Sequence, residues 1–242
     1  MSRHDEIRSA YRALGQQASF YDGMITCSTF WGRLICKVVW NMDEETNLRC
    51  FETAFSGIPE DFSGRLLEVP VGTGVLSMPV YKGLKKADIT CLDYSADMMA
   101  AAERRAGETD LKNIRFVQGD VGALPFPDAS FDLVLSLNGF HAFPLKDKAY
   151  RETLRVLKPG GTFCGCFYIS GENRRTDWFI RNFYIRSGFF TPPFETLQSL
   201  TERLSGMYAE ARVEAVEGIG CFVCKKAKSR DQTGVRPAER GD

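Results

Sequence analysis

The middle of the chain alternates short apolar segments with segments of helical character, and this alternation constrains the fold more than any other feature. Each apolar segment ends at a glycine-rich turn or at a polar residue. Such alternation implies right-handed β-α-β crossovers, and therefore a mainly parallel sheet with helices on both faces. The expected strands are 65–69, 88–92, 114–118, 131–137 and 161–169, and the expected helices are 75–85, 95–107 and 146–157.

The last two apolar segments do not follow this alternation, because no helical segment separates them. Residues 212–216 and 219–225 form two extended segments that are separated only by Glu217-Gly218. A connection this short can join only antiparallel strands, because a parallel crossover needs a dozen residues or more. The sheet is therefore expected to end in an antiparallel hairpin.

Size and charge limit what this chain can do. Its 242 residues suffice for one sizeable domain but hardly for two. Acidic and basic side chains number 31 each, which disfavours nucleic acid and anionic membranes as partners, although a local basic patch is compatible with that balance. No stretch approaches the roughly 20 apolar residues of a membrane span, and residues 1–12 lack the apolar core of a signal peptide. We therefore expect a cytoplasmic protein.

The eight cysteines are expected to be reduced thiols, because we find no secretory signal. Cys164 and Cys166 would share one face of a strand, whereas Cys221 and Cys224 would point to opposite faces. We interpret both pairs as buried small hydrophobic residues, with zinc or redox chemistry as the alternative. No metal site is expected.

A turn with two glycines, Gly72-Thr73-Gly74, follows the first expected strand and opens the first expected helix. Glycines let the backbone approach a ligand closely, and a helix N-terminus offers unpaired N–H groups. Asp93 follows at the end of the next strand, where an acid can accept both hydroxyls of a ribose. Because open parallel sheets bind ligands beyond the carboxyl ends of their strands, these residues predict a nucleotide-like ligand.

Two kinds of nucleotide-like ligand fit this position, and they differ in their charge. A dinucleotide site has the pattern Gly-x-Gly-x-x-Gly, but this chain has Ser77 at the third glycine position. Glu68 would also place a negative charge near a pyrophosphate. An acid suits a ligand with an ammonium group, and S-adenosylmethionine (SAM) combines such a group with ribose and adenine but carries no phosphate. The charges therefore favour SAM.

At these residues the chain resembles the class I SAM-dependent methyltransferases, in particular the small-molecule branch that includes quinone-biosynthesis C-methyltransferases. The resemblance covers residues 66–169 and rests on several motifs that occur in order. These motifs are Leu67-Glu68-Val69 with Gly72-Thr73-Gly74, Asp93-Tyr94-Ser95 with Met98, Gly119-Asp120-Val121, and the segments 130–134 and 155–161.

The resemblance implies a Rossmann-like, doubly wound, seven-stranded sheet with the terminal hairpin, and it assigns roles to single residues. The glycine turn would contact the methionine part of SAM, Asp93 the ribose, and Asp120 the adenine amino group. Tyr21-Asp22 resembles the segment at which a lid closes over SAM. Pro70 departs from the family, which usually has a glycine there. The implied cofactor-binding residues are Tyr21, Glu68, Gly72, Thr73, Gly74, Asp93, Tyr94, Met98, Asp120, Val121 and Asn138.

The activity that the resemblance implies is methyl transfer to a small-molecule acceptor, with S-adenosylhomocysteine as the product. Transfer is an in-line displacement in which positioning is the main catalytic effect. The acceptor should meet SAM near Asn138. His141, which can titrate near neutral pH, is the candidate base, with packing as its alternative role. An aromatic insert with Arg174 and Arg175 suggests an aromatic or acidic acceptor, or else a cap with solvated arginines.

We expect a helical lid over residues 1–60, a SAM-binding domain over 61–226 with a cap insert near 171–200, and a disordered tail over 227–242. Two other functions fit part of the pattern. A nicotinamide-dependent oxidoreductase is disfavoured by the missing third glycine and by the hairpin. A regulatory or scaffold protein with a degenerate site is disfavoured by the intact Gly72, Gly74, Asp93 and Asp120.

Overall fold

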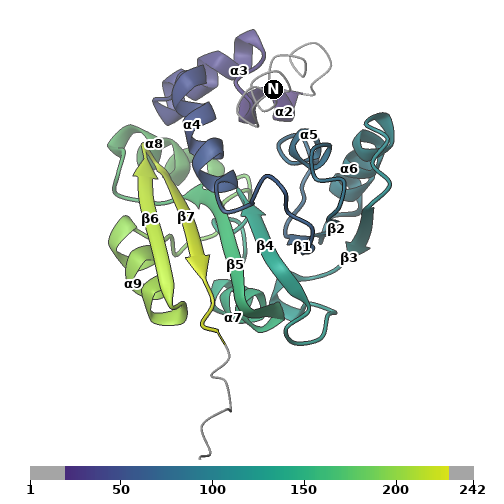
Figure 1. The fold of residues 1–242 in the computed structure, drawn as a ribbon. Coiled ribbons are helices and arrows are strands. Elements are labelled where there is room, and N and C mark those ends of the chain that lie inside the picture. The colour runs from purple at the N-terminus through teal and green to yellow at the C-terminus, as the bar shows by residue number, and fades with distance from the viewer. Residues whose placement is uncertain (1–19, 229–242) are drawn as a thin grey trace, which may run out of the picture.

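The computed structural model describes residues 20–228, which form one seven-stranded sheet in the order β3-β2-β1-β4-β5-β7-β6 (Figure 1). Strand β7 is antiparallel to both of its neighbours, and the other neighbouring strands pair in parallel. The expected doubly wound sheet with a terminal antiparallel hairpin is confirmed. The strands are β1 Arg65–Glu68, β2 Asp88–Asp93, β3 Ile114–Gln118, β4 Phe131–Leu137, β5 Leu157–Tyr168, β6 Glu210–Val216 and β7 Ile219–Lys225.

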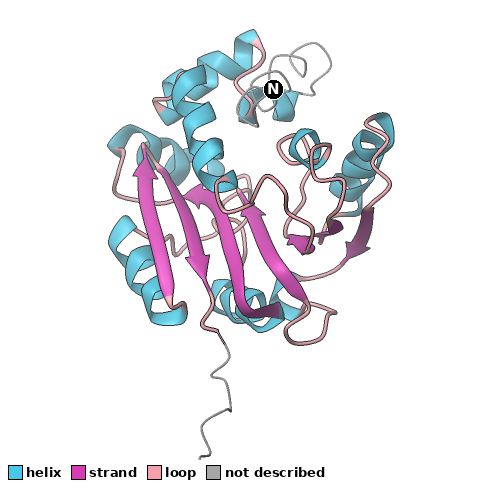
Figure 2. Ribbon diagram, in the orientation of Figure 1, coloured by secondary structure: helices cyan, strands magenta, loops and turns pink. Residues whose placement is uncertain are grey.

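Helices cover both faces of the sheet (Figure 2). One apolar core lies under α4, α5 and α6, and a second core lies on the opposite face under α7 and α9. The helical segments are α2 Phe20–Ile25, α3 Phe30–Ile35, η1 Cys36–Trp40, α4 Glu44–Phe55, α5 Met78–Tyr81, α6 Ala96–Glu108, η2 Val121–Ala123, α7 Lys146–Val156, α8 Arg174–Phe179, η3 Ile180–Tyr184 and α9 Leu197–Met207.

The first expected helix, over 75–85, is wrong in length, because only α5 (Met78–Tyr81) is helical there. Pro79 lies in its first turn and cannot donate a backbone hydrogen bond. At its other end, Gly83 N–H donates to Val80 O and Leu84 N–H donates to Tyr81 O, which are three-residue turns. The connection between β1 and α5, residues 69–77, is therefore a loop at the carboxyl end of β1.

The N-terminal helices lie beyond the carboxyl ends of the central strands (Figure 1). Helices α2 and α3 approach so closely that a Cβ on Gly32 would lie 1.8 Å from Gly23 O. Cys27 and Cys36 form a disulfide across this turn, so the expectation of reduced thiols is wrong for this pair. Residues 1–19, and the expected tail from 229 on, lie outside the described residues.

The other six cysteines are buried and form no disulfide. Cys164 and Cys166 contribute to one core, and Cys221 and Cys224 contribute to opposite cores, as the strand pattern predicts.

Among residues 20–228, no helix is long and apolar enough to cross a membrane.

Gly165 on β5 allows β4 and β5 to pair, because a Cβ there would lie 1.9 Å from Ser136 O. We predict that Gly165→Ala lowers the free energy of unfolding by about 2–4 kcal/mol, since a backbone atom would have to move. Urea unfolding measures this change.

Gly107→Ala is the matched control, because nothing lies within 4 Å of its Cβ position on α6. It should leave stability unchanged or raise it by up to about 1 kcal/mol. Equal effects of the two substitutions would contradict the close approach of β4 and β5.

Candidate cofactor site

A pocket opens at the carboxyl ends of β1 and β4. It is lined by Glu68 at the end of β1, by the loop 70–77, by Ile25 of α2, and by Leu137 and Asn138 at the end of β4. The carboxyl ends of the two central strands meet here because both strands are parallel. This is the edge at which open parallel sheets bind ligands.

Asp93, at the end of β2, organises the loop. Gly72 N–H donates to its Oδ2 at 2.8 Å, and Ser95 N–H donates to its Oδ1 at 2.9 Å. The residue is only 7% exposed, so the carboxylate is held in one position. Because each carboxylate oxygen can accept more than one hydrogen bond, both can still accept a ligand hydroxyl.

Gly72 leaves its backbone open to a ligand. Its φ of 56° is in the left-handed region, and nothing lies within 4 Å of a Cβ built on it. Gly74 has a different role, because a Cβ there would lie 2.8 Å from Met78 Cε. The first glycine therefore provides access, and the second allows the loop to pack on α5.

Pro70 packs its ring against Gly139. A Cβ on Gly139 would lie 2.3 Å from Pro70 Cδ. The bond between Val69 and Pro70 is cis. Pro70 and Gly139 are therefore fitted to each other, and Gly139 follows directly on Asn138 of the pocket.

Glu68 is a buried acid at the base of the pocket, and it is 1% exposed. Tyr81 O–H donates to its Oε2 at 2.9 Å, and Cys91 Sγ lies 3.6 Å from the same oxygen. Burial raises the pKa of Glu68 to about 8, despite these hydrogen bonds. A cationic group bound nearby would favour its charged form.

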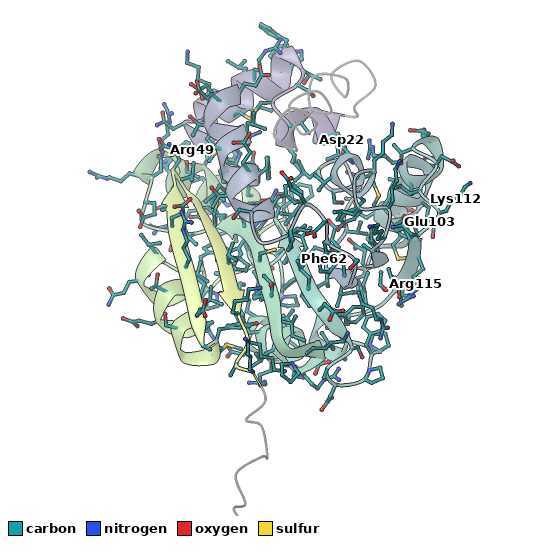
Figure 3. All side chains as sticks on the ribbon, in the orientation of Figure 1. Asp22, Arg49, Phe62, Glu103, Lys112 and Arg115 are labelled. Carbon is teal, nitrogen blue, oxygen red and sulfur yellow. A yellow bond between two sulfur atoms is a disulfide. The ribbon has the colours of Figure 1, made fainter. Side chains whose placement is uncertain are left out.

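Three side chains connect the N-terminal helices to this loop. Thr73 Oγ1 donates to Asp22 Oδ1 at 2.6 Å, and Arg105 Nη2 pairs with Asp22 Oδ2 at 2.9 Å. Arg105 Nη1 also donates to the carbonyl of Thr73 at 2.6 Å. Asp22 lies on α2 above the sheet (Figure 3) and is 4% exposed. Arg105 was not predicted from the sequence, because no local pattern distinguishes it from a solvated basic residue of α6.

The remaining residues implied for the cofactor differ in their surroundings. Tyr94 is 79% exposed, Met98 is half-buried and Val121 is buried. Asp120 is exposed, and its Oδ1 accepts from Gly122 N at 2.7 Å. It therefore caps η2 and has a second oxygen available for a ligand. Tyr21 lies in α2, but its side chain is outside the described part of the chain.

The surroundings of His141 differ from those expected of a base. Its ring stacks on Phe190 with centroids 4.1 Å apart, and Tyr168 N–H donates to Nδ1 at 3.3 Å. Burial, and then the charge of Lys146, lower the pKa of His141 to about 3. His141 is also absent from the residues that line the pocket. The packing role fits it better than the role of a base.

The two arginines of the insert have different surroundings. Arg175 donates to the carbonyl of Lys37 at 2.9 Å and to Asn41 Oδ1, so it caps η1 and does not face the pocket. Arg174 is exposed. The aromatic side chains do gather: the rings of Trp40, Tyr184 and Phe190 are in contact beside His141.

Among residues 20–228, no group of three His, Cys, Asp or Glu is arranged to hold a metal ion.

Comparisons with known proteins agree with this architecture. Residues 66–161 match a family model described as a methyltransferase domain. The chain is 39% identical over 97 residues to demethylmenaquinone methyltransferase of Thermus thermophilus, which covers 40% of this chain and 44% of that protein. It is 38% identical over 99 residues to fatty-acid O-methyltransferase of Mycolicibacterium smegmatis, which covers 41% and 35%. The chain thus spans less than half the length of these curated relatives.

The structure is similar to that of phosphoethanolamine N-methyltransferase 2 of Haemonchus contortus, which was solved with phosphomonomethylethanolamine and S-adenosylhomocysteine. The TM-score is 0.64 at 16% identity, and the match covers 90% of this chain and 61% of that one. This likeness shows the fold.

The raised pKa of Glu68 makes stability depend on pH. Between about pH 4.5 and pH 8 the folded chain binds more protons at Glu68 than the unfolded chain does, so stability falls as the pH rises through this range. We expect the free energy of unfolding to fall by roughly 3–5 kcal/mol between pH 5 and pH 8, and we predict that Glu68→Gln abolishes this fall. Urea unfolding of both proteins at the two pH values measures the difference. An identical pH dependence would show that Glu68 is charged in the fold at neutral pH.

The contact between Asp22 and Arg105 predicts how firmly α2 is held. Asp22→Asn removes the ion pair, and hydrogen exchange of residues 20–27 should become about tenfold faster, because a partly buried charged contact is lost. Mass spectrometry measures the exchange.

Glu103→Gln is the control, since Glu103 is exposed on the same helix as Arg105 (Figure 3). Unchanged exchange in Asp22→Asn would mean that other contacts hold α2.

Proposed function

Because residues 66–161 form a class I SAM-dependent methyltransferase domain, we propose that the chain transfers a methyl group from SAM to a small-molecule acceptor. The observation that carries the proposal is Asp93, whose carboxylate is held by two backbone N–H groups, one of them from Gly72 of the pocket. A fixed carboxylate with acceptor capacity on both oxygens suits the two hydroxyls of a ribose.

The other residues of the pocket fit the remaining parts of SAM. The glycine loop has room for the amino acid end, because nothing lies within 4 Å of a Cβ on Gly72. Glu68 supplies a buried acid for the ammonium group, and the pocket holds no second acid among its lining residues. On the side of Asp93, Asp120 and the exposed ring of Tyr94 are available to the adenine.

When bound, SAM supplies a methyl group on a sulfonium that leaves as a neutral thioether. The chain contributes positioning and exclusion of water. Asn138, at the end of β4, lines the pocket where the acceptor would approach. His141 is too weak a base at neutral pH to remove a proton efficiently, given its lowered pKa. We therefore propose that alignment is the main source of the rate.

The aromatic rings beside His141 favour an apolar acceptor. Trp40, Tyr184 and Phe190 form an aromatic wall beyond the ends of β4 and β5. The names of the two relatives refer to a demethylmenaquinone and to fatty acids, which have large apolar parts. We propose that residues 1–60 act as a lid that Asp22 connects to the loop, and that residues 171–200 act as the cap over the acceptor.

Calorimetric titration with SAM, S-adenosylhomocysteine and NAD tests this proposal. We expect binding of the first two ligands and none of NAD. Asp93→Asn should weaken SAM binding by about tenfold or more, because hydrogen bonds to a charged acceptor are lost. Asp97→Asn is the matched control, since this exposed acid lies nearby in the first turn of α6. NAD binding, or equal effects of the two substitutions, would overturn the proposal.

A further inference from the structure

Two helical segments present large apolar side chains to solvent. On the segment α3–η1, Phe30 is 68% exposed and Trp31 is 61% exposed. On the segment α8–η3 and the turn after it, Trp178, Phe183 and Phe189 are each more than half exposed. Leu34 and Val38 extend the apolar side of the first segment. So many exposed aromatic rings on neighbouring helices are unusual for a protein surface that has no partner.

The two segments are packed against each other through α8 and η1. Thr176 Oγ1 donates to Val39 O at 2.7 Å, and Arg175 donates to the carbonyl of Lys37. Both segments lie beyond the carboxyl ends of β4 and β5 (Figure 1). We call the exposed side chains of residues 30–40 and 174–190 the aromatic-basic surface.

The charges on this surface have one sign. Residues 30–40 and 174–190 contain six basic side chains, all exposed. Their single acid, Asp177, is buried and accepts from Tyr168 O–H and Gly171 N–H. None of the six basic side chains forms an ion pair with an acid of residues 20–228. They are Arg33, Lys37, Arg174, Arg175, Arg181 and Arg186.

We propose that the aromatic-basic surface docks the protein on anionic phospholipid membranes. Tryptophan and phenylalanine insert at the boundary between headgroups and acyl chains, and each basic residue near an anionic leaflet adds to binding. Basic groups that form no ion pair match a surface of uniform negative charge better than they match a protein partner of mixed charge. The chain has equal numbers of acidic and basic residues, so this local asymmetry is not a consequence of its overall charge.

The inner side of the same segments faces the proposed acceptor site. Trp40 of η1 and Tyr184 of η3 contact Phe190, which stacks on His141. An apolar acceptor dissolved in the bilayer would therefore lie close to the proposed acceptor site of the docked protein. This consequence rests on the proposed function, whereas membrane docking does not depend on it.

Flotation of the full chain with phospholipid vesicles tests the proposal without any enzymatic assay. We expect binding to vesicles of phosphatidylcholine with phosphatidylglycerol, weaker binding to phosphatidylcholine alone, and loss of the difference at high salt, because screening weakens exposed charges. No binding to the anionic vesicles, or binding that is independent of salt, would overturn the proposal.

Variants separate the two contributions. Trp178→Ser with Phe183→Ser should reduce binding to both kinds of vesicle, and Arg174→Gln with Arg181→Gln should reduce binding to the anionic vesicles about tenfold. Lys85→Gln with Lys86→Gln is the matched charge control, because these exposed lysines precede β2 and therefore lie at its amino end, away from the carboxyl ends of the parallel strands. Equal binding of all three variants would overturn the proposal. Sedimentation as a dimer that dissociates in the Trp178 and Phe183 variant, without vesicle binding, would assign the surface to a second copy of the chain.

Discussion

The hydrogen bonds from Gly72 and Ser95 to the Asp93 carboxylate hold the site together. They join the loop after β1 to the start of α6, so that the connections that follow β1 and β2 both contact the Asp93 carboxylate. Val71 N–H also donates to Leu92 O at 3.0 Å, which extends the pairing of β1 and β2 into the loop. The open backbone of Gly72 and the contact of Thr73 with Asp22 both depend on this placement.

Most of the fold could be predicted from the sequence, because the strands of a doubly wound sheet are buried on both faces and read as apolar segments. The bounds expected for β3, β4 and β7 agree with the structure residue by residue. The hairpin followed from a two-residue connection, where geometry leaves one option. The helix expected over 75–85 failed because apolar periodicity does not register Pro79 and the turns around Gly83.

The site could be predicted only where a residue's position along the chain also sets its place in the fold. Asp93 and Gly72 follow strands directly, so the topology brings them together. His141 follows a strand as well, but its protonation depends on Phe190, nearly fifty residues away, which buries its ring. The role of Arg105 depends on Asp22 in the same way, and the disulfide between Cys27 and Cys36 depends on the turn between α2 and α3. Such pairings arise in the tertiary structure and leave no local pattern.

A crystal structure of the full chain with S-adenosylhomocysteine tests the assignment of the pocket most directly. We predict that both ribose hydroxyls lie within hydrogen-bond distance of Asp93, with the amino acid end over residues 72–74. A nucleoside bound elsewhere, or an Asp93 that contacts only the N–H groups of Gly72 and Ser95, would contradict this assignment.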